Sequence, residues 1–585
     1  MGCQDIFTLL VTSILPALSD PSIAFNSQHM YVLQSLAQVK SIVLLTDIPS
    51  SEKLIVHLFA SFFDMLSGSS RATTGEQLAK NVEFNLTAIL EILVDESSTL
   101  PGEVVDIIMA QFLRVDPHAV SSNLTKGKKH GVAPVDDRQS TLLLKELPAA
   151  YNMAKSICNS CTDKMARHVS QYFNDVIMDA SSSSATNGAA RHRSHRRSSV
   201  DLDDSDDGRP SGPTEDDLEE LRKAHRLLRE LWRACPGVLQ NVIPQLEAEL
   251  SAENVQLRLL ATETLGDIVS GIGAVGPPPP PPMDPAAYPP ATITAYAHNS
   301  APQNPLSTPC SPQPFPHTYS SAYNNFLGRR QDKSGLIRAA WTTGIGRILT
   351  TSAGGVGLSR HEEERLVSDL AHMLGDSDEK VRIAAVKAVG GFGFSDILAN
   401  LGLSGGILTP GSVLATLAER VRDRKHIVRV EAMRLLGRIW GVAAGEIATG
   451  EEQVISLIGG APSKILDTFY TNDMEINVLL DRVLFELLLP LSYPPIKSKG
   501  TKTAIGSSQR VGDSQANGET EAQPPDADRL RTERILVLVK HLDEKAKRVF
   551  FALQARQVGM AKILATFLKR CEDFNVSQNI LSDLG

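Results

Sequence analysis

VRIAAVKAVGGF, residues 381–392, contains the pattern that decides the fold. Counted from Arg382, apolar residues stand one position before it and three, seven and ten positions after it, and a glycine stands at the eighth. These apolar positions fall on one face of an α-helix. The glycine carries no side chain, so we expect another backbone to approach the helix closely there.

The same offsets recur around Arg258, Arg338 and Arg429, which together with Arg382 are called the signature arginines. Arg338 and Arg382 lie 44 residues apart, and Arg382 and Arg429 lie 47 apart, which is the period of HEAT and armadillo repeats. The longer gap after Arg258 contains a proline-rich segment. A repeated helix with one apolar face must stack on its neighbours to bury that face. The sequence therefore predicts an all-α, HEAT-repeat α-solenoid, a right-handed superhelix of helix pairs.

An aspartate stands six residues before three signature arginines, at Asp332, Asp376 and Asp423, whereas the first copy has Ala252 there. An aspartate in the turn and an arginine on the following helix can pair from repeat to repeat along the stack. The alternative is that each aspartate caps its own helix and each arginine is solvated. The identical offset in three copies favours pairing between repeats.

Three polar or proline-rich segments interrupt the helical pattern, and their composition predicts disorder. Such inserts suit a solenoid, because they can emerge at turns without disturbing the stack. We expect N-terminal helical repeats at 5–180, a disordered insert at 181–214, HEAT repeats at 215–272, a proline-rich disordered insert at 273–316, HEAT repeats at 317–493, a disordered insert at 494–527 and C-terminal helical repeats at 528–582.

The composition narrows the class of protein. The 585 residues carry a formal net charge of −9, which argues against a surface that grips nucleic acid throughout. Six scattered cysteines form no disulfide framework and fit a reducing compartment. No apolar run reaches the ~18 residues that a membrane helix needs, so we expect no membrane contact.

The motifs of common enzymes are missing. Gly271, Gly273 and Gly276 have the spacing of a dinucleotide fingerprint, but a helix precedes them and prolines follow, so we expect them to end a helix. Cys158 and Cys161 lack the second pair that a zinc ribbon needs. The chain also has no Walker loop, metalloprotease helix, nucleophile elbow or kinase signature. We expect no enzyme, no cofactor, and no catalytic or metal-binding residue.

Two basic stretches are candidate interaction sites. The most basic helical segment, 420–438, supplies the candidate partner-binding residues Arg422, Arg424, Lys425, Arg434 and Arg438, with a solvated helix edge as the alternative. The run at 191–199 lies in the first insert. It can serve nuclear import, bind a polyanion, or present Ser198 and Ser199 for phosphorylation, and the alternative is a solvated linker.

Several longer stretches resemble one family. They are NSQHMYVLQSLAQVKS at 26–41, YFNDV at 172–176, LWRACP at 231–236, VIPQLEAEL at 242–250 and the block from Glu533 through LDEKA at 542–546. They resemble the fungal form of the cohesin-associated sister chromatid cohesion factors, the "precocious dissociation of sisters" family. The likeness runs from about Asp5 to Asn575, broken by the three inserts.

The resemblance implies a hook-like, non-enzymatic HEAT-repeat protein of the nucleus. Such proteins bind the kleisin subunit of cohesin, act with other cohesin regulators, and control the maintenance and release of sister chromatid cohesion in mitosis. Chromatin association would then be indirect, through cohesin. The family's Ala-Pro-Asp-Ala segment, which engages the wings-apart-like release factor, is missing and the chain appears truncated at both ends, so release-factor binding is doubtful here. An importin-like transport receptor is the alternative function.

Overall fold

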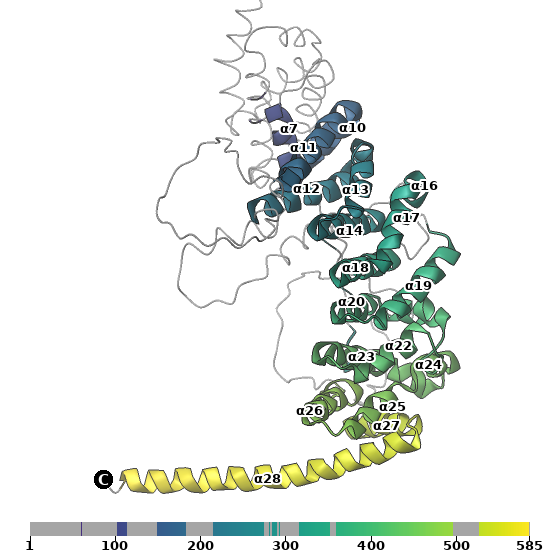
Figure 1. Cartoon of the computed structure of the whole chain (residues 1–585). Helices are drawn as coiled ribbons and strands as arrows, with labels where there is room; N and C mark the ends of the chain where they lie inside the picture. Colours follow the sequence, from purple (N-terminus) through teal and green to yellow (C-terminus); the bar gives the residue numbers. More distant parts are fainter. Residues whose placement is uncertain are drawn as a thin grey trace, which may run out of the picture. The chain divides into compact units, whose positions relative to one another are not determined.

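The computed structural model describes residues 102–113, 149–182, 215–273, 315–351, 358–494 and 526–583, with positions 56 and 60 and short pieces between 276 and 292. All regular elements in these ranges are helices (Figure 1). They form two compact units, Met1–Pro278 with Pro302–Leu358 and Pro279–Ala301 with Ser359–Gly585. Ser198 and Ser199, most of the first and third expected inserts, and nearly all of 5–101 lie outside the described residues.

In the described part of the first unit, four helices precede the first stacked helix pair: α7 (Gly102–Leu113), α10 (Ala149–Ser160), α11 (Thr162–Ser182) and α12 (Glu215–Ala234). Helix α12 begins with three acidic residues, which favour a helix N-terminus. Leu221, Leu228 and Leu231 share one face of α12 and are buried. A 3₁₀ turn, η4 (Pro236–Leu239), follows α12 and contacts α11.

Two stacked helix pairs complete the first unit. α13 (Ile243–Leu250) precedes α14 (Val255–Ser270), and α16 (Phe315–Thr318), α17 (Ser320–Gly328) and η5 (Arg329–Gln331) precede α18 (Gly335–Thr351). α13 packs on α17, and α14 packs on α18. The signature positions Ala261, Leu265, Trp341 and Ile345 are fully buried between them. α14 ends at Gly271, whose φ of 70° is left-handed, so the prediction that this glycine ends a helix is confirmed.

The second unit repeats this arrangement over a longer stretch. Its elements are α19 (Arg360–Leu374), α20 (Glu379–Gly390), α21 (Phe394–Ala399), η6 (Leu401–Ser404), α22 (Val413–Glu419), η7 (Arg420–Arg422), α23 (His426–Thr449), α24 (Glu452–Ile458), α25 (Ala461–Leu466), η8 (Asp467–Thr471), α26 (Met474–Val483), η9 (Leu484–Leu488), α27 (Ala527–Lys540) and α28 (Glu544–Asp583).

Three pairs follow one another here: α19 with α20, α22 with α23, and α25 with α26. The first helices α19, α22 and α25 touch in turn, and so do the second helices α20, α23 and α26. The signature positions Ala385, Val389, Ala432 and Leu436 are fully buried in this shared core. Stacked pairs that bury one repeated face are the HEAT arrangement, so the predicted all-α, HEAT-repeat fold is confirmed.

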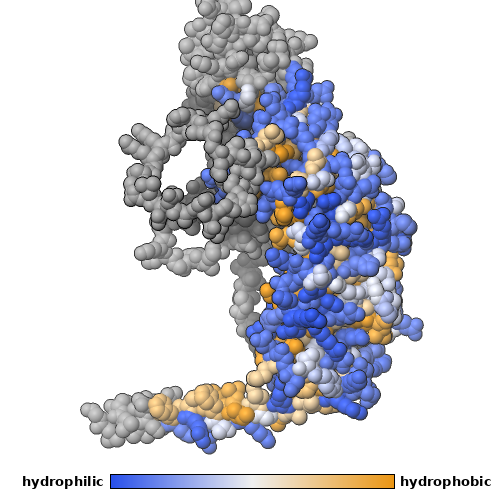
Figure 2. Space-filling model, viewed as in Figure 1, coloured by the Kyte–Doolittle hydropathy of each residue, from blue (hydrophilic) through white to orange (hydrophobic). Residues whose placement is uncertain are grey.

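Helix α28 is 40 residues long and differs from the others. Its first turns bury Val549 and Leu553 near α25, with which α28 packs. Farther along, Ile563, Leu564 and Phe567 are exposed, and Figure 2 shows hydrophobic residues along this helix. Only the start of α28 therefore contributes to the core of the second unit.

One stretch of the proline-rich insert differs from the expectation of disorder at 273–316. Met283 is buried, and the ring of Tyr288 meets that of Tyr493 edge to face, with 6.0 Å between centroids. This piece belongs to the second unit. The reason is local composition, because methionine, tyrosine and proline side chains offer apolar area that the more polar parts of the insert lack.

Candidate partner-binding surface

Each signature arginine closes the turn that precedes its own helix. Its Nη1 donates a hydrogen bond to the backbone carbonyl six residues earlier: Arg258 to Ala252 at 2.6 Å, Arg338 to Asp332 at 2.8 Å, Arg382 to Asp376 at 2.9 Å and Arg429 to Asp423 at 2.9 Å. These carbonyls end the preceding helical turn and have no helical partner. The arginines are therefore part of the turn and not solvated.

The turn aspartates accept hydrogen bonds from the same turns. The Oδ1 atoms of Asp332, Asp376 and Asp423 each accept from the backbone N–H two residues later, at 2.9, 2.8 and 2.9 Å. This Asx-turn geometry fixes the entry into the following helix. Capping of the helix start, one of the two alternatives from the sequence, is therefore one role of these carboxylates.

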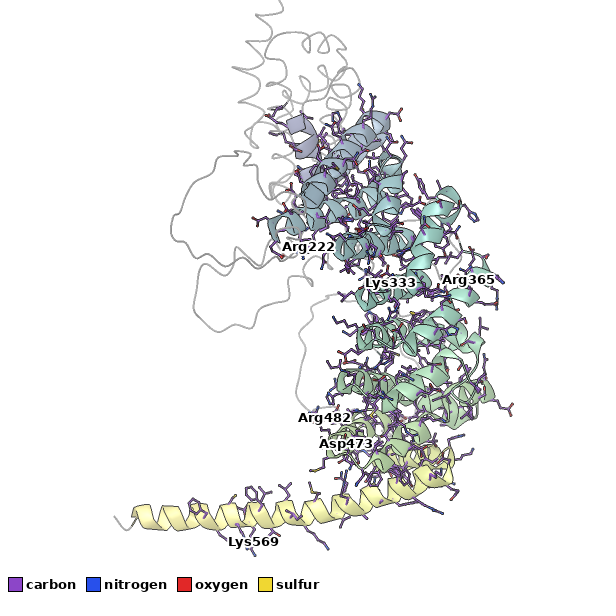
Figure 3. All side chains as sticks on the ribbon, in the orientation of Figure 1. Arg222, Lys333, Arg365, Asp473, Arg482 and Lys569 are labelled. Carbon is purple, nitrogen blue, oxygen red and sulfur yellow. The ribbon has the colours of Figure 1, made fainter. Side chains whose placement is uncertain are left out.

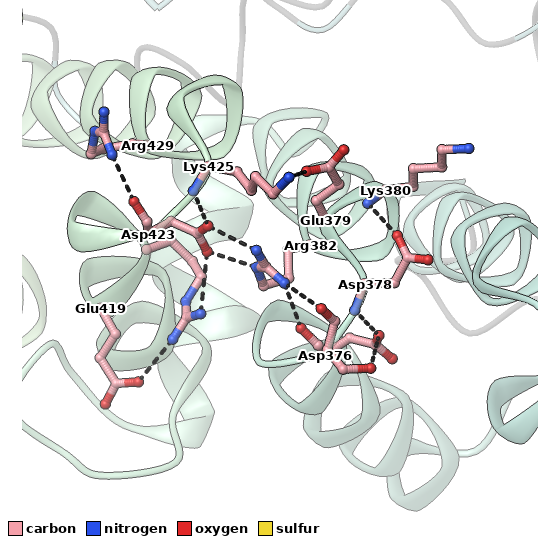
Figure 4. Close-up of polar contacts among 11 residues, drawn as sticks. Asp376, Asp378, Glu379, Lys380, Arg382, Glu419, Asp423, Lys425 and Arg429 are labelled. Carbon is pink, nitrogen blue, oxygen red and sulfur yellow. Dashed lines mark hydrogen bonds and ion pairs between the residues drawn. The ribbon is translucent and has the colours of Figure 1, made fainter. Parts of the chain in front are cut away.

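Two of these carboxylates, those of Asp332 and Asp423, also join successive repeats. Arg382 donates from Nε and Nη2 to the two carboxylate oxygens of Asp423 at 2.7 and 2.8 Å, and both residues are buried (Figure 4). In the first unit, Arg258 Nε lies 3.4 Å from Asp332 Oδ2. The structure thus brings together Arg258 with Asp332 and Arg382 with Asp423, from one helix pair to the next.

Asp423 has a lowered pKa because its partners outweigh its burial. Burial alone would raise this pKa, but the hydrogen bonds from Arg382 and from the Lys425 N–H, and the charges of Arg382 and Arg420, lower it. The hydrogen bond to Asp423 likewise raises the pKa of Arg382. The pair is therefore ionised on both sides at neutral pH.

A second arginine supports Asp332 and Asp423, and sequence reasoning missed this role. Arg329 Nη1 lies 3.3 Å from Asp332 Oδ2, and Arg420 Nη1 lies 3.4 Å from Asp423 Oδ2. Both arginines stand three residues before their aspartate, whereas Met373 has that position before Asp376. The shared offset was a usable signal, although only two copies carry it.

The five predicted partner-binding residues fall into two groups. Arg422 lies 3.4 Å from Asp467, and Lys425 lies 2.8 Å from Glu379, so both have acidic neighbours. Arg424 is exposed, and Arg434 and Arg438 are half-buried one turn apart on α23. Within the described ranges, these three arginines make no ion pair or side-chain hydrogen bond. No acidic neighbour therefore holds these three side chains within those ranges.

Exposed basic residues also stand on the neighbouring second helices. Lys380 and Lys387 on α20 and Arg482 on α26 are exposed, and Figure 3 labels Arg482 on its helix. We call Lys380, Lys387, Arg424, Arg434, Arg438 and Arg482 the basic face. A cationic surface on a chain of net charge −9 attracts acidic partner segments and orients them.

A buried pair in the first unit has strongly perturbed acid–base groups. His225 Nε2 on α12 lies 3.4 Å from Glu249 Oε2 on α13, and His225 Nδ1 lies 2.9 Å from Thr264 Oγ1 on α14. Burial lowers the pKa of His225 to about 3 and raises the pKa of Glu249 to about 8. Both are neutral at pH 7 and inaccessible to solvent, so the pair joins three helices and offers no reactive site.

Other chemistry has little support in the part of the chain that the structure describes. Cys158 and Cys161 are buried free thiols. No three or more histidine, cysteine or acidic residues gather as a metal site within these ranges. None of the described helices combines the length and apolar character needed to cross a bilayer.

Comparisons with known proteins agree on one family. The family described as "Sister chromatid cohesion protein PDS5 protein" matches residues 2–583. The cohesion protein pds5 of Schizosaccharomyces pombe is 27% identical over 98% of this chain and 36% of its own length. PDS5 of Saccharomyces cerevisiae is 23% identical over 99% of this chain and 34% of its own. The chain thus spans about a third of the length of these relatives.

A solved structure shares the fold. The structure of a Pds5–Scc1 complex matches 95% of this chain and 63% of the solved chain, with a TM-score of 0.55 and 21% identity. The family match covers nearly every residue, including both stacks of helix pairs and the basic face. The chain belongs to the PDS5 family of sister chromatid cohesion proteins.

Proposed function

We propose that this chain is a non-enzymatic scaffold that binds the kleisin subunit of cohesin and so regulates the maintenance and release of sister chromatid cohesion in mitosis. The observation that carries the proposal is the family match over residues 2–583. The solved Pds5–Scc1 complex adds that a protein of this fold binds Scc1. Through cohesin the chain would act in the nucleus on chromatin, together with other cohesin regulators. Membership of this family favours cohesin as the partner over the cargo of an importin-like transport receptor.

The basic face is the surface we assign to the kleisin. Arg424, Arg434 and Arg438 have no acidic partner within the described ranges, so a bound carboxylate would not have to displace one. Arg422 and Lys425 border this surface and already face Asp467 and Glu379. An acidic kleisin segment laid across α20, α23 and α26 would therefore gain charge-assisted contacts mainly from the three unpaired arginines.

The proposal is tested by mixing the purified chain with a purified fragment of the kleisin from the same organism. Size-exclusion chromatography should show the two co-eluting as one complex. Separate elution, with a chain whose thermal melt is cooperative, would overturn the proposal, because the scaffold would be folded and still not bind.

A further inference from the structure

A short piece of the proline-rich insert is seated on helix α23 of the second unit. Its backbone makes a tight turn, in which Asp284 Oδ1 accepts from the Ala286 N–H at 2.9 Å and the Asp284 carbonyl accepts from the Ala287 N–H at 3.3 Å. Met283, the residue just before this turn, is buried. We call residues 283–288 with Pro290 the strap.

Two glycines one turn apart on α23 make room for the strap. A Cβ atom added at Gly441 would lie 2.7 Å from Pro285 Cβ, and one added at Gly445 would collide with Pro290. Pro290 supplies the three atoms nearest to a Cβ at Gly445, whereas Gly441 also faces the backbone of Leu487. The two prolines thus occupy space that side chains would fill on other helices, and Gly445 faces the strap most directly.

The edge of this groove is aromatic and cationic. Tyr493 meets Tyr288 of the strap, and the Arg534 guanidinium lies 4.7 Å from the centre of the Tyr493 ring. Arg534 on α27 is buried and donates to the carbonyls of Leu488 and Gly441, both at 2.9 Å. No carboxylate lies within ion-pairing distance of Arg534 among the described residues, and Asp284 of the strap supplies the nearby negative charge.

We propose that this groove, lined by Gly441, Gly445, Tyr493 and Arg534, is a binding site for a proline-containing acidic peptide of a partner protein that makes the same turn, and that the strap occupies it in cis as a competitor. Proline fixes one backbone torsion in advance, so a turn that contains proline loses less entropy on binding than a more flexible segment does. The inference is independent of kleisin binding, because the groove contains no residue of the basic face.

Tethering sets how the strap competes. A segment held close to its site by a flexible linker has an effective concentration of roughly millimolar. A weakly bound strap therefore keeps the groove closed against weak ligands, but a partner peptide that binds more tightly displaces it. The groove would thus select partners by affinity.

The test uses the full chain and a fluorescent peptide with the sequence of residues 283–292, MDPAAYPPAT, measured by fluorescence anisotropy. The double substitution Asp284→Ala/Tyr288→Ala weakens the contact of the cis strap with the groove. We expect this variant protein to bind the peptide at least about tenfold more tightly than the wild type does. Adding Gly445→Leu should abolish that binding. Gly559→Leu, at a position where a Cβ would meet nothing within 4 Å, is the matched control.

Two results would overturn the proposal. One is a strap-weakened variant that melts cooperatively yet binds the peptide no better than the wild type, or that binds equally well with Gly445→Leu. The other is a wild-type chain that dimerises in sedimentation and loses the dimer with Gly445→Leu, because the groove would then hold the strap of a second copy.

Discussion

At the scale of single residues, one carboxylate does most to join neighbouring repeats. Asp423 fixes its own turn through the Lys425 N–H and accepts both hydrogen bonds from Arg382 of the preceding pair. Arg382 in turn donates to the carbonyls of Asp376 and Ser377. Removing Asp423 would leave the buried Nε and Nη2 of Arg382 without these acceptors, and removing Arg382 would take both of its hydrogen bonds from a buried carboxylate.

We predict that Arg382→Glu loosens the stack far more than Arg424→Glu. Arg382→Glu should lower the free energy of unfolding by about 3–5 kcal/mol, because it removes the bidentate partner of the buried Asp423 and brings a second carboxylate toward it. Arg424→Glu changes an exposed side chain and should cost less than about 0.5 kcal/mol. Urea unfolding of both variants measures the difference, and equal losses would contradict the pairing between repeats.

The sequence offsets located these residues but not their full geometry. The six-residue spacing placed Asp423 in the turn before the helix of Arg429, and the structure shows the hydrogen bond from the Arg429 side chain to the Asp423 carbonyl. The spacing favoured pairing between repeats, as Arg382 and Asp423 show, but not its bidentate geometry, because that depends on how separate helix pairs pack. Nor could it show which basic residues of 420–438 have acidic neighbours, since Glu379 and Asp467 come from other turns.

At the scale of helices, close backbone approach decides how two pairs meet. A Cβ added at Gly266 on α14 would lie 3.0 Å from the Cα of Gly344 on α18. The sequence correctly marked Gly266 as a close-approach position. Its partner, however, is Gly344 and not the equivalent Gly346, and Gly390, which has the same offset as Gly266, has only ordinary contacts at 3.7 Å. The register between two helices depends on how they pack together, and the residue pattern of one helix alone does not show this.

Gly266→Ala is predicted to destabilise the first unit. Alanine gains about 1 kcal/mol over glycine in a helix interior, but here its Cβ must push two backbones apart, which typically costs about 1–3 kcal/mol. We expect a net loss, seen as a lower midpoint of thermal unfolding. Gly559→Ala, with free space around the new Cβ, should be neutral or stabilising. A midpoint for Gly266→Ala at or above that of the wild type would contradict the close approach.

The buried pair of α12 and α13 predicts a particular pH dependence. The pKa of Glu249 rises on folding from 4.5 to about 8, so the folded state holds a proton that the unfolded state loses, and stability falls as pH rises through this range. The pKa of His225 falls from 6.5 to about 3, so stability also falls as pH drops below 6.5. Together the two groups give a plateau between 4.5 and 6.5.

Glu249→Gln isolates the alkaline side of this curve. Glutamine does not titrate, so the variant should gain stability relative to the wild type as pH rises from about 5 to 9, by up to a few kcal/mol. Denaturant unfolding of both proteins across this range measures the gain. A stability difference that does not change with pH would show that Glu249 is not held protonated in the folded state.

At the scale of the whole molecule, the stacked pairs present a repeated helical surface. The core buries the repeated apolar face of the helices. The polar sides of α20, α23 and α26 therefore stay on the surface, where a partner can contact them. The period and the resemblance were enough to predict the fold class and the family. The seating of the strap was not predictable, because a proline-rich composition does not reveal that two glycines on a distant helix accept it.

The most direct measurement of the central claim is calorimetric titration of the kleisin fragment into three proteins: the wild type, Arg424→Glu/Arg434→Glu/Arg438→Glu, and Arg365→Glu. Arg365 is an exposed residue of α19 and lies outside the basic face (Figure 3). The account predicts that the wild type and Arg365→Glu bind alike and that the triple variant binds at least about tenfold more weakly, a loss of about 1.4 kcal/mol or more. A folded wild type that does not bind the fragment would contradict the scaffold role, and a triple variant that binds as well as the wild type would contradict the basic face.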